Sequence, residues 1–189
     1  MKRKLLLFFL LSSVFISCGR KAYINTSGFE RPVRKNIFSY SNRFTSLPKQ
    51  IDTNAIYVHR CQFQTGGGSI LGFSYLRFFS SGQVQYVESR SKLDLTHLND
   101  FDKGYIGRYY FKNDKLHMQL FYNPGTFYSI VKFRGYFTGD TLFIRFTTST
   151  HTPWCSTANL EDPLSFFEKK VFKWEKQNVI FKSNQTPNW

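Results

Sequence analysis

Apolar and polar residues alternate with a period of two along much of the chain between residues 55 and 183. In residues 115–122 the even-numbered positions are apolar or aromatic, whereas Lys115, His117 and Gln119 are polar. This period is typical of a β-strand with one buried face, because successive side chains of a strand point to opposite faces. The pattern therefore favours strands over helices in this part of the chain.

Turn residues divide this region into eight segments that we expect to be strands, with a short ninth left open. Gly82 and the pairs Asn113-Asp114 and Gly139-Asp140 are typical of tight turns between antiparallel strands. One helical turn is expected around residues 95–101. The expected strands are residues 56–64, 70–79, 83–89, 105–112, 115–122, 127–137, 141–147 and 166–176, and the possible ninth is residues 179–182.

Short connections require neighbouring strands to be antiparallel, and a long meander must protect its edge strands. We therefore predict an all-β fold, an antiparallel up-and-down β-barrel of about eight strands, with a two-sheet β-sandwich as the alternative. Residues 105–146 contain YIGRYYFKNDKLHMQLF, a turn, a long strand and a Gly-Asp turn. This pattern resembles the β-meander of lipocalin-like bacterial lipoproteins, although the Gly-x-Trp motif of classical lipocalins is not found near the first expected strand.

The N-terminus has the pattern of an export signal. Three basic residues precede an uncharged, mostly apolar run at residues 5–16, which is shorter than the ~20 residues needed to span a bilayer. The sequence FISCG at residues 15–19 resembles the lipobox of bacterial lipoproteins. The resemblance implies cleavage before Cys18 and acylation of that cysteine. A plain secretory signal and an uncleaved membrane anchor are the alternatives.

The resulting organisation has four parts: a signal peptide (residues 1–17), a lipid-anchored tether (18–54), a β-barrel domain (55–183) and a tail (184–189). Several acyl chains on Cys18 would anchor the protein stably, since each buried CH₂ contributes roughly 0.8 kcal/mol. Gly19 stands where lipoproteins retained at the inner membrane often carry Asp. By this resemblance the protein is expected in the cell envelope, at the outer membrane rather than the inner.

Positive charge is concentrated beside this expected anchor. The formal net charge is +14, and residues 18–50 contain seven Lys or Arg against one acid, Glu30. Because basic residues near a membrane gain about 1 kcal/mol each from anionic headgroups, we expect contact with acidic lipid or lipopolysaccharide, or else a solvated linker. Scattered basic residues without a recognition motif argue against nucleic acid. The candidate membrane-contact residues are Arg20, Lys21, Arg31, Arg34 and Lys35.

Two cysteines remain once Cys18 is assigned to the lipid. Cys61 and Cys155 form an even pair in a compartment that favours disulfides. A bridge between them would close a loop of ~95 residues and stabilise the fold by about 4–5 kcal/mol in the chain-entropy model. We predict this disulfide, with two buried free thiols as the alternative.

The sequence contains no catalytic or metal-binding motif that we recognise. The four histidines lie no closer than 20 residues apart, and neither H-E-x-x-H nor C-x-x-C occurs. We therefore predict no catalytic residue, no metal ligand and no cofactor, and place an enzyme last among the possible functions.

Aromatic residues make up 19% of the chain, with 22 Phe and 11 Tyr. Small barrels fill their interiors with side chains, so an aromatic core is the first explanation. A pocket for an apolar or glycan ligand is the second, because Tyr and Trp combine a flat apolar face with a polar group. The candidate ligand-binding residues are Tyr75, Tyr86, Tyr109, Tyr110, Tyr122, Tyr128 and Trp154.

Two functions remain open on this basis. The first is a non-catalytic, lipid-anchored module that binds a small apolar ligand or envelope lipid, which requires an open cavity. The second is a structural or interaction lipoprotein with a filled core, acting through a protein partner, which requires an exposed apolar surface.

Overall fold

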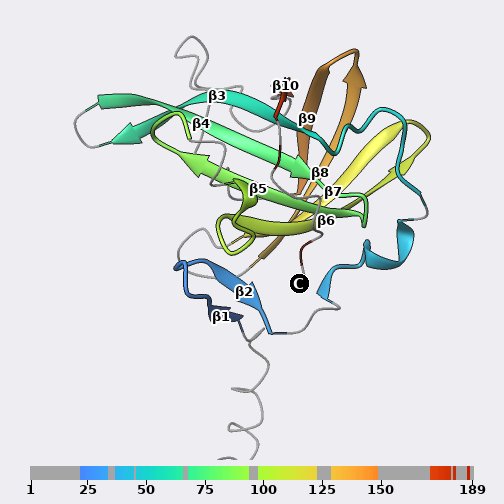
Figure 1. The fold of residues 1–189 in the computed structure, drawn as a ribbon, viewed down its shortest axis with the longest axis horizontal. Coiled ribbons are helices and arrows are strands. Elements are labelled where there is room, and N and C mark those ends of the chain that lie inside the picture. Colours follow the sequence, from blue (N-terminus) through green and yellow to red (C-terminus); the bar gives the residue numbers. More distant parts are fainter. Residues whose placement is uncertain are drawn as a thin grey trace, which may run out of the picture.

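The computed structural model describes residues 22–33, 37–44, 46–65, 68–93, 98–122, 129–148, 171–179, 181 and 187. Eight antiparallel strands of this part form a closed barrel, in which consecutive strands pair and the last returns to the first (Figure 1). The strands are β3 (Ala55–Thr65), β4 (Gly68–Phe78), β5 (Gln83–Ser89), β6 (Tyr105–Lys112), β7 (Lys115–Tyr122), β8 (Ser129–Thr138), β9 (Thr141–Thr148) and β10 (Val171–Asn178).

This architecture confirms the predicted up-and-down barrel over the β-sandwich. Closure is made by β10, in which Glu175 pairs with Val58 of β3 on one side and with Thr141 of β9 on the other. The barrel therefore has no free edge strand among its eight strands, as the edge argument required. The possible ninth strand is not formed at Val179 or Phe181, which instead pack on the outside of the barrel.

Tight turns connect the strands at one end of the barrel. Asn113 and Asp114 both have positive φ, 51° and 56°, as a two-residue turn between twisted strands requires. Gly82 also has positive φ, 77°, and a β-carbon there would lie 2.5 Å from the ring of Phe44. The expected helical turn is seen at residues 98–99 as a short 3-10 turn, and residues 94–97 lie outside the described part.

Aromatic rings close the barrel at this end. Phe44 packs edge-on against Tyr109, and Tyr109 against Phe78, with ring centroids 5.4 Å and 5.0 Å apart. Tyr57 continues the series, 5.5 Å from Phe78. The Tyr109 hydroxyl donates to the Phe79 carbonyl at 2.6 Å, which satisfies its only polar atom inside the barrel.

The outer wall of the barrel is also covered over a large area. The hairpin β1 (Ala22–Ile24) and β2 (Glu30–Pro32), the 3-10 helix η3 (Ser41–Arg43) and Phe38 lie against β6 and β7 (Figure 1). The loop that precedes β6 covers β4 and β5. β3 begins at Ala55, the predicted first residue of the barrel domain, and the described residues before it pack on the barrel rather than extending away from it.

Polar side chains on the outer wall hold these covering segments in place. Arg77 of β4 donates to the Leu98 carbonyl at 2.8 Å, and Gln85 of β5 donates to the carbonyls of Asp100 and Lys103. Gln83 reaches the Pro187 carbonyl at 3.0 Å. Within the described residues, no helix has the length and apolar character needed to cross a membrane.

Candidate functional site

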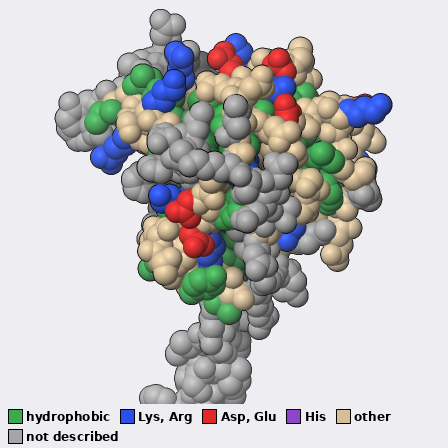
Figure 2. Space-filling model, viewed as in Figure 1, with side chains coloured by type: hydrophobic (Ala, Val, Ile, Leu, Met, Phe, Trp, Pro, Cys, Tyr) green, Lys and Arg blue, Asp and Glu red, His purple; other side chains and the backbone are tan. Residues whose placement is uncertain are grey.

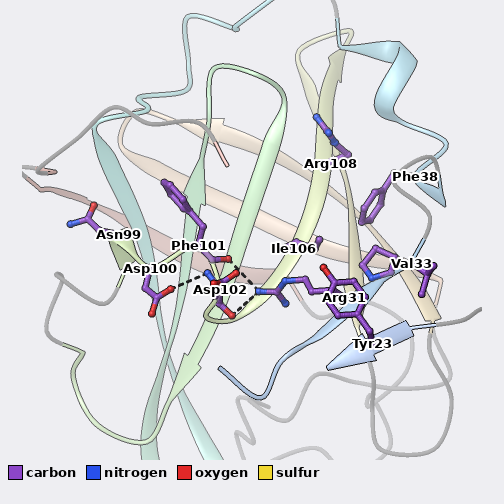
Figure 3. A pocket seen from close by; sticks show the side chains of 11 residues that line it. Tyr23, Arg31, Val33, Phe38, Asn99, Asp100, Phe101, Asp102, Ile106 and Arg108 are labelled. Carbon is purple, nitrogen blue, oxygen red and sulfur yellow. Dashed lines mark hydrogen bonds between the residues drawn. The ribbon is translucent and has the colours of Figure 1, made fainter. Parts of the chain in front are cut away.

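A groove of about 420 Å³ lies between the β1–β2 hairpin, the loop before β6 and the outer wall of the barrel (Figure 3). Small-molecule sites usually have volumes of ~300–1,000 Å³, and this groove lies in that range, although five of its eleven lining residues are polar or charged. Its lining residues are Tyr23, Arg31, Pro32, Val33, Phe38, Asn99, Asp100, Phe101, Asp102, Ile106 and Arg108.

Arg31 fastens the hairpin to the barrel. Its side chain is only 3% exposed, and its guanidinium donates to the carbonyls of Gly104 and Asp102, each at 2.8 Å, and of Phe101 at 3.3 Å. Burial lowers the pKa of Arg31, and the nearby Asp102 opposes this shift. Since arginine starts from a pKa above 12, the group remains charged at neutral pH, and it serves as a structural clamp.

The apolar part of the groove runs from a buried floor to an exposed rim. Phe38 and Ile106 form the floor and are almost fully buried. Tyr23 and Val33 form the rim and are more than half exposed, and Ile24 of the same hairpin is also exposed. Figure 2 shows hydrophobic side chains gathered in this region, at the lower part of the view, with acidic and basic side chains beside them.

Opposite charges lie at different sides of the groove. Arg108 is on one side, near Phe38, and Asp100 is on the other (Figure 3). Asp100 accepts a hydrogen bond from the Asp102 amide and pairs with Lys103 at 3.4 Å. Arg108 donates to the Ser81 carbonyl, and burial lowers its pKa without removing its charge. The groove thus combines an apolar floor with the cation of Arg108 at one side and the acidic side chains of Asp100 and Asp102 at the other.

Unlike the groove on the outer wall, the interior of the barrel is filled by side chains in the described part. Inward-facing side chains of all eight strands form one hydrophobic cluster, and the cavity left between them is about 20 Å³. That volume accommodates about one water molecule. The described part therefore supports the first explanation of the aromatic content, a packed core, and offers no interior space for an apolar ligand.

Glu88 of β5 is a partly buried carboxyl group that contacts the Tyr86 hydroxyl. Burial raises the pKa of Glu88 to about 7, although a hydrogen bond from the Tyr86 hydroxyl partly opposes the shift. Because the pKa of Glu88 is higher in the folded state than in the unfolded state, protonation of Glu88 stabilises the fold. This contribution to the unfolding free energy is complete below pH 4.5 and is lost as the pH rises through about 7.

Replacing Glu88 with Gln is therefore expected to remove this loss. Between pH 4.5 and 8, the unfolding free energy of the wild type should fall relative to Glu88→Gln by up to roughly 3 kcal/mol. Urea denaturation of both proteins across this range measures the difference. His59, whose pKa burial lowers, is present in both proteins and cancels in the comparison. A difference that does not change with pH would contradict the assignment.

The structure does not bring the described candidate tyrosines together. Tyr86 and Tyr109 face the interior, whereas Tyr75 and Tyr110 lie on the outer wall. The Tyr75 hydroxyl accepts from the Leu93 amide at 2.9 Å, beneath the covering loop. The ring of Tyr110 stacks on that of His117, with centroids 4.7 Å apart, and Tyr110 is not among the residues that line the groove. The side chain of Tyr122, together with Tyr128 and Trp154, lies outside the described part.

Most of the other candidates also lie outside the described residues: Cys18, Arg20, Lys21, Arg34, Lys35 and Cys155. The backbone of Cys61 lies in β3 opposite Gly72, and its side chain is not described, so the disulfide stays a prediction. Arg31 corrects the expected set of membrane contacts, because its guanidinium is buried against backbone carbonyls instead of being exposed to a membrane surface.

Fold and site together define an all-β antiparallel barrel whose interior is packed in the described part, with a groove of mixed polar and apolar lining on its outer wall. No group of three His, Cys, Asp or Glu side chains in the described ranges is arranged to hold a metal ion. Compared with protein-family models, with curated protein sequences and with solved structures, the chain gives no significant match.

Proposed function

We propose that this protein is a lipid-anchored cell-envelope module that binds a membrane amphiphile in the groove beneath the β1–β2 hairpin. The observation that carries the proposal is the position of the groove, which is built from the hairpin that directly follows the lipobox-like sequence. Binding is non-catalytic, and the outer membrane is the favoured location because Gly19 follows Cys18.

Chain length limits how far the groove can be from the anchor. Ala22, the first residue of β1, is four residues after Cys18. Four extended residues span at most ~14 Å, so acylation of Cys18 would hold the hairpin close to the bilayer surface. The exposed apolar side chains of Tyr23, Ile24 and Val33 are then next to the membrane, where they have an apolar environment to contact.

The chemistry of the groove suits one class of ligand. A hydrocarbon chain can lie over the buried floor of Phe38 and Ile106, where it would remove the exposed apolar surface of Val33 and Tyr23 from water. The positive charge of Arg108 beside this floor favours an anionic headgroup on the same side. A lipid with an acyl chain and an acidic headgroup meets both requirements.

Val33→Asp is expected to weaken lipid binding by about tenfold or more, because it places a charge where the acyl chain lies. Binding is measured by titrating the purified full chain with a fluorescent anionic phospholipid. Val171→Asp on β10 is the matched control, since Val171 is 50% exposed against 53% for Val33 and lies outside the groove. Equal affinities for the two variants would contradict binding in the groove.

A second function, an interaction module acting through a protein partner, is favoured by the filled interior of the barrel. The exposed hairpin would then contact a protein of the envelope. Native mass spectrometry of the protein extracted from membranes separates the two functions. A non-covalent lipid mass that is lost on denaturation supports the amphiphile, and its absence supports the protein partner.

A further inference from the structure

Two polar atoms inside the barrel lack a hydrogen-bond partner among the described residues: Nε2 of His59 and Nε1 of Trp174. Both side chains are only 6% exposed. They lie on the adjacent strands β3 and β10, with ring centroids 5.3 Å apart. A buried polar group without a partner destabilises a fold and is uncommon, so two neighbouring ones indicate a missing partner that both can share.

Both side chains line the same cavity. It is the interior cavity of about 20 Å³, whose wall also includes the hydroxyl-bearing residues Ser74 and Tyr86. Those two hydroxyls lie 3.2 Å apart and bond to each other. The rest of the wall is apolar: Leu76, Met118, Leu120, Phe133, Ile144 and Phe172. A cavity that holds a water must provide ~10–15 Å³ and at least two polar partners, and this one provides both.

The protonation of His59 follows from its neighbour. Nδ1 of His59 lies 2.8 Å from the Lys173 carbonyl, and a carbonyl oxygen can only accept, so Nδ1 carries the proton. Burial lowers the pKa of His59, which keeps the ring neutral at pH 7. Nε2 is then a bare acceptor, while the indole Nε1–H of Trp174 is a donor only.

We propose that the barrel contains an internal binding site for one hydroxyl group, which donates to His59 Nε2 and accepts from Trp174 Nε1. A carboxylate has no proton for His59, an ammonium has no lone pair for Trp174, and a hydrocarbon satisfies neither atom. Since the cavity of about 20 Å³ has room for about one water molecule, we assign the hydroxyl to a bound water. This site is inside the barrel and is separate from the groove, which lies on the outer surface of the barrel.

The test is NMR spectroscopy of the ¹⁵N-labelled full chain at pH 7, with Trp174→Phe used to assign the Trp174 indole resonance. The expected result has two parts: His59 is the neutral Nδ1–H tautomer with a hydrogen-bonded Nε2, and the Trp174 Nε1 proton shows a cross-peak to a hydroxyl. A cross-peak at the water frequency identifies bound water. A cross-peak to aliphatic protons of a co-purified molecule would contradict the proposal, because the cavity has room for about one water molecule.

Two further results would overturn the proposal: a proton on His59 Nε2, or a Trp174 indole proton with no cross-peak to water. Stability supplies a second test. If Trp174→Phe raises the folding equilibrium constant despite the loss of buried ring volume, the indole donor has no partner and the site is empty.

Discussion

Cys18→Ser is expected to abolish incorporation of a fatty acid into this protein. Serine lacks the thiol to which a diacylglycerol is attached, and the lipobox-like sequence at residues 15–19 then has no acceptor. The effect should be complete, because Cys18 is the only acylation site that the sequence predicts. Metabolic labelling with an alkyne fatty acid, followed by purification of the full chain, measures it directly.

The chain provides its own controls for this experiment. Cys61→Ser and Cys155→Ser remove the other two cysteines and should leave labelling intact. If Cys18→Ser still incorporates the fatty acid, the lipid is attached to another residue and the predicted acylation of Cys18 is wrong. An unlabelled wild type would indicate a plain secretory signal or an uncleaved anchor, and the mass of the N-terminal peptide distinguishes these two.

Gly107→Ala is expected to disrupt the barrel itself. A β-carbon at Gly107 of β6 would lie 2.0 Å from the main-chain oxygen of Gln119 and 2.7 Å from Cδ2 of Leu120. The Gln119 oxygen belongs to β7, which is paired with β6 along its length, so it cannot move away without breaking the sheet. We expect the unfolding free energy to fall by about 3 kcal/mol or more, measured by urea denaturation.

Gly139→Ala is the contrasting variant. Gly139 has a positive φ of 56° in the β8–β9 turn, but a β-carbon there meets no atom within 4 Å. We expect Gly139→Ala to lower the unfolding free energy by only ~1–2 kcal/mol, which is what an alanine loses in a left-handed backbone conformation. If both alanine variants lost the same stability, the close approach of β6 and β7 at Gly107 would not be what makes glycine necessary there.

The barrel could be predicted because its signals are local. Alternation along β7 and the turn residues Asn113, Asp114 and Gly139 specify strands and their connections within a few residues of sequence. Closure followed from the need to remove edge strands. None of these inferences needed knowledge of which distant segments meet, which is why they were reliable from one sequence.

The groove could not be predicted, because it depends on contacts between distant segments. Residues 22–38 have a polar, basic composition that is typical of a linker, yet Arg31 lies some 70 residues from the carbonyls it bonds. The turn around Gly28, with its positive φ of 80°, was the one local signal of a hairpin in that segment. Nothing in the sequence showed that this hairpin would dock on β6.

Buried arginines also change the meaning of the net charge. Arg77 is almost fully buried on the outer wall of β4, where its guanidinium lies 3.6 Å from the ring centroid of Phe181 and 4.8 Å from that of Phe79. Burial lowers its pKa to about 10, so it is still charged at pH 7. Together with Arg31, it contributes to the formal charge of +14 without offering an exposed cation to a membrane.

Photocrosslinking is a direct test of whether a lipid binds in the groove beneath the β1–β2 hairpin. The full chain is inserted into membranes that contain an anionic phospholipid with a photoreactive acyl chain, and the labelled peptides are identified by mass spectrometry. Lipid binding in the groove predicts label on the peptides that contain Val33, Phe38 and Ile106, and a strong reduction of this label in Val33→Asp but not in Val171→Asp. Label confined to β8, β9 and β10, or equal in both variants, would contradict lipid binding in the groove.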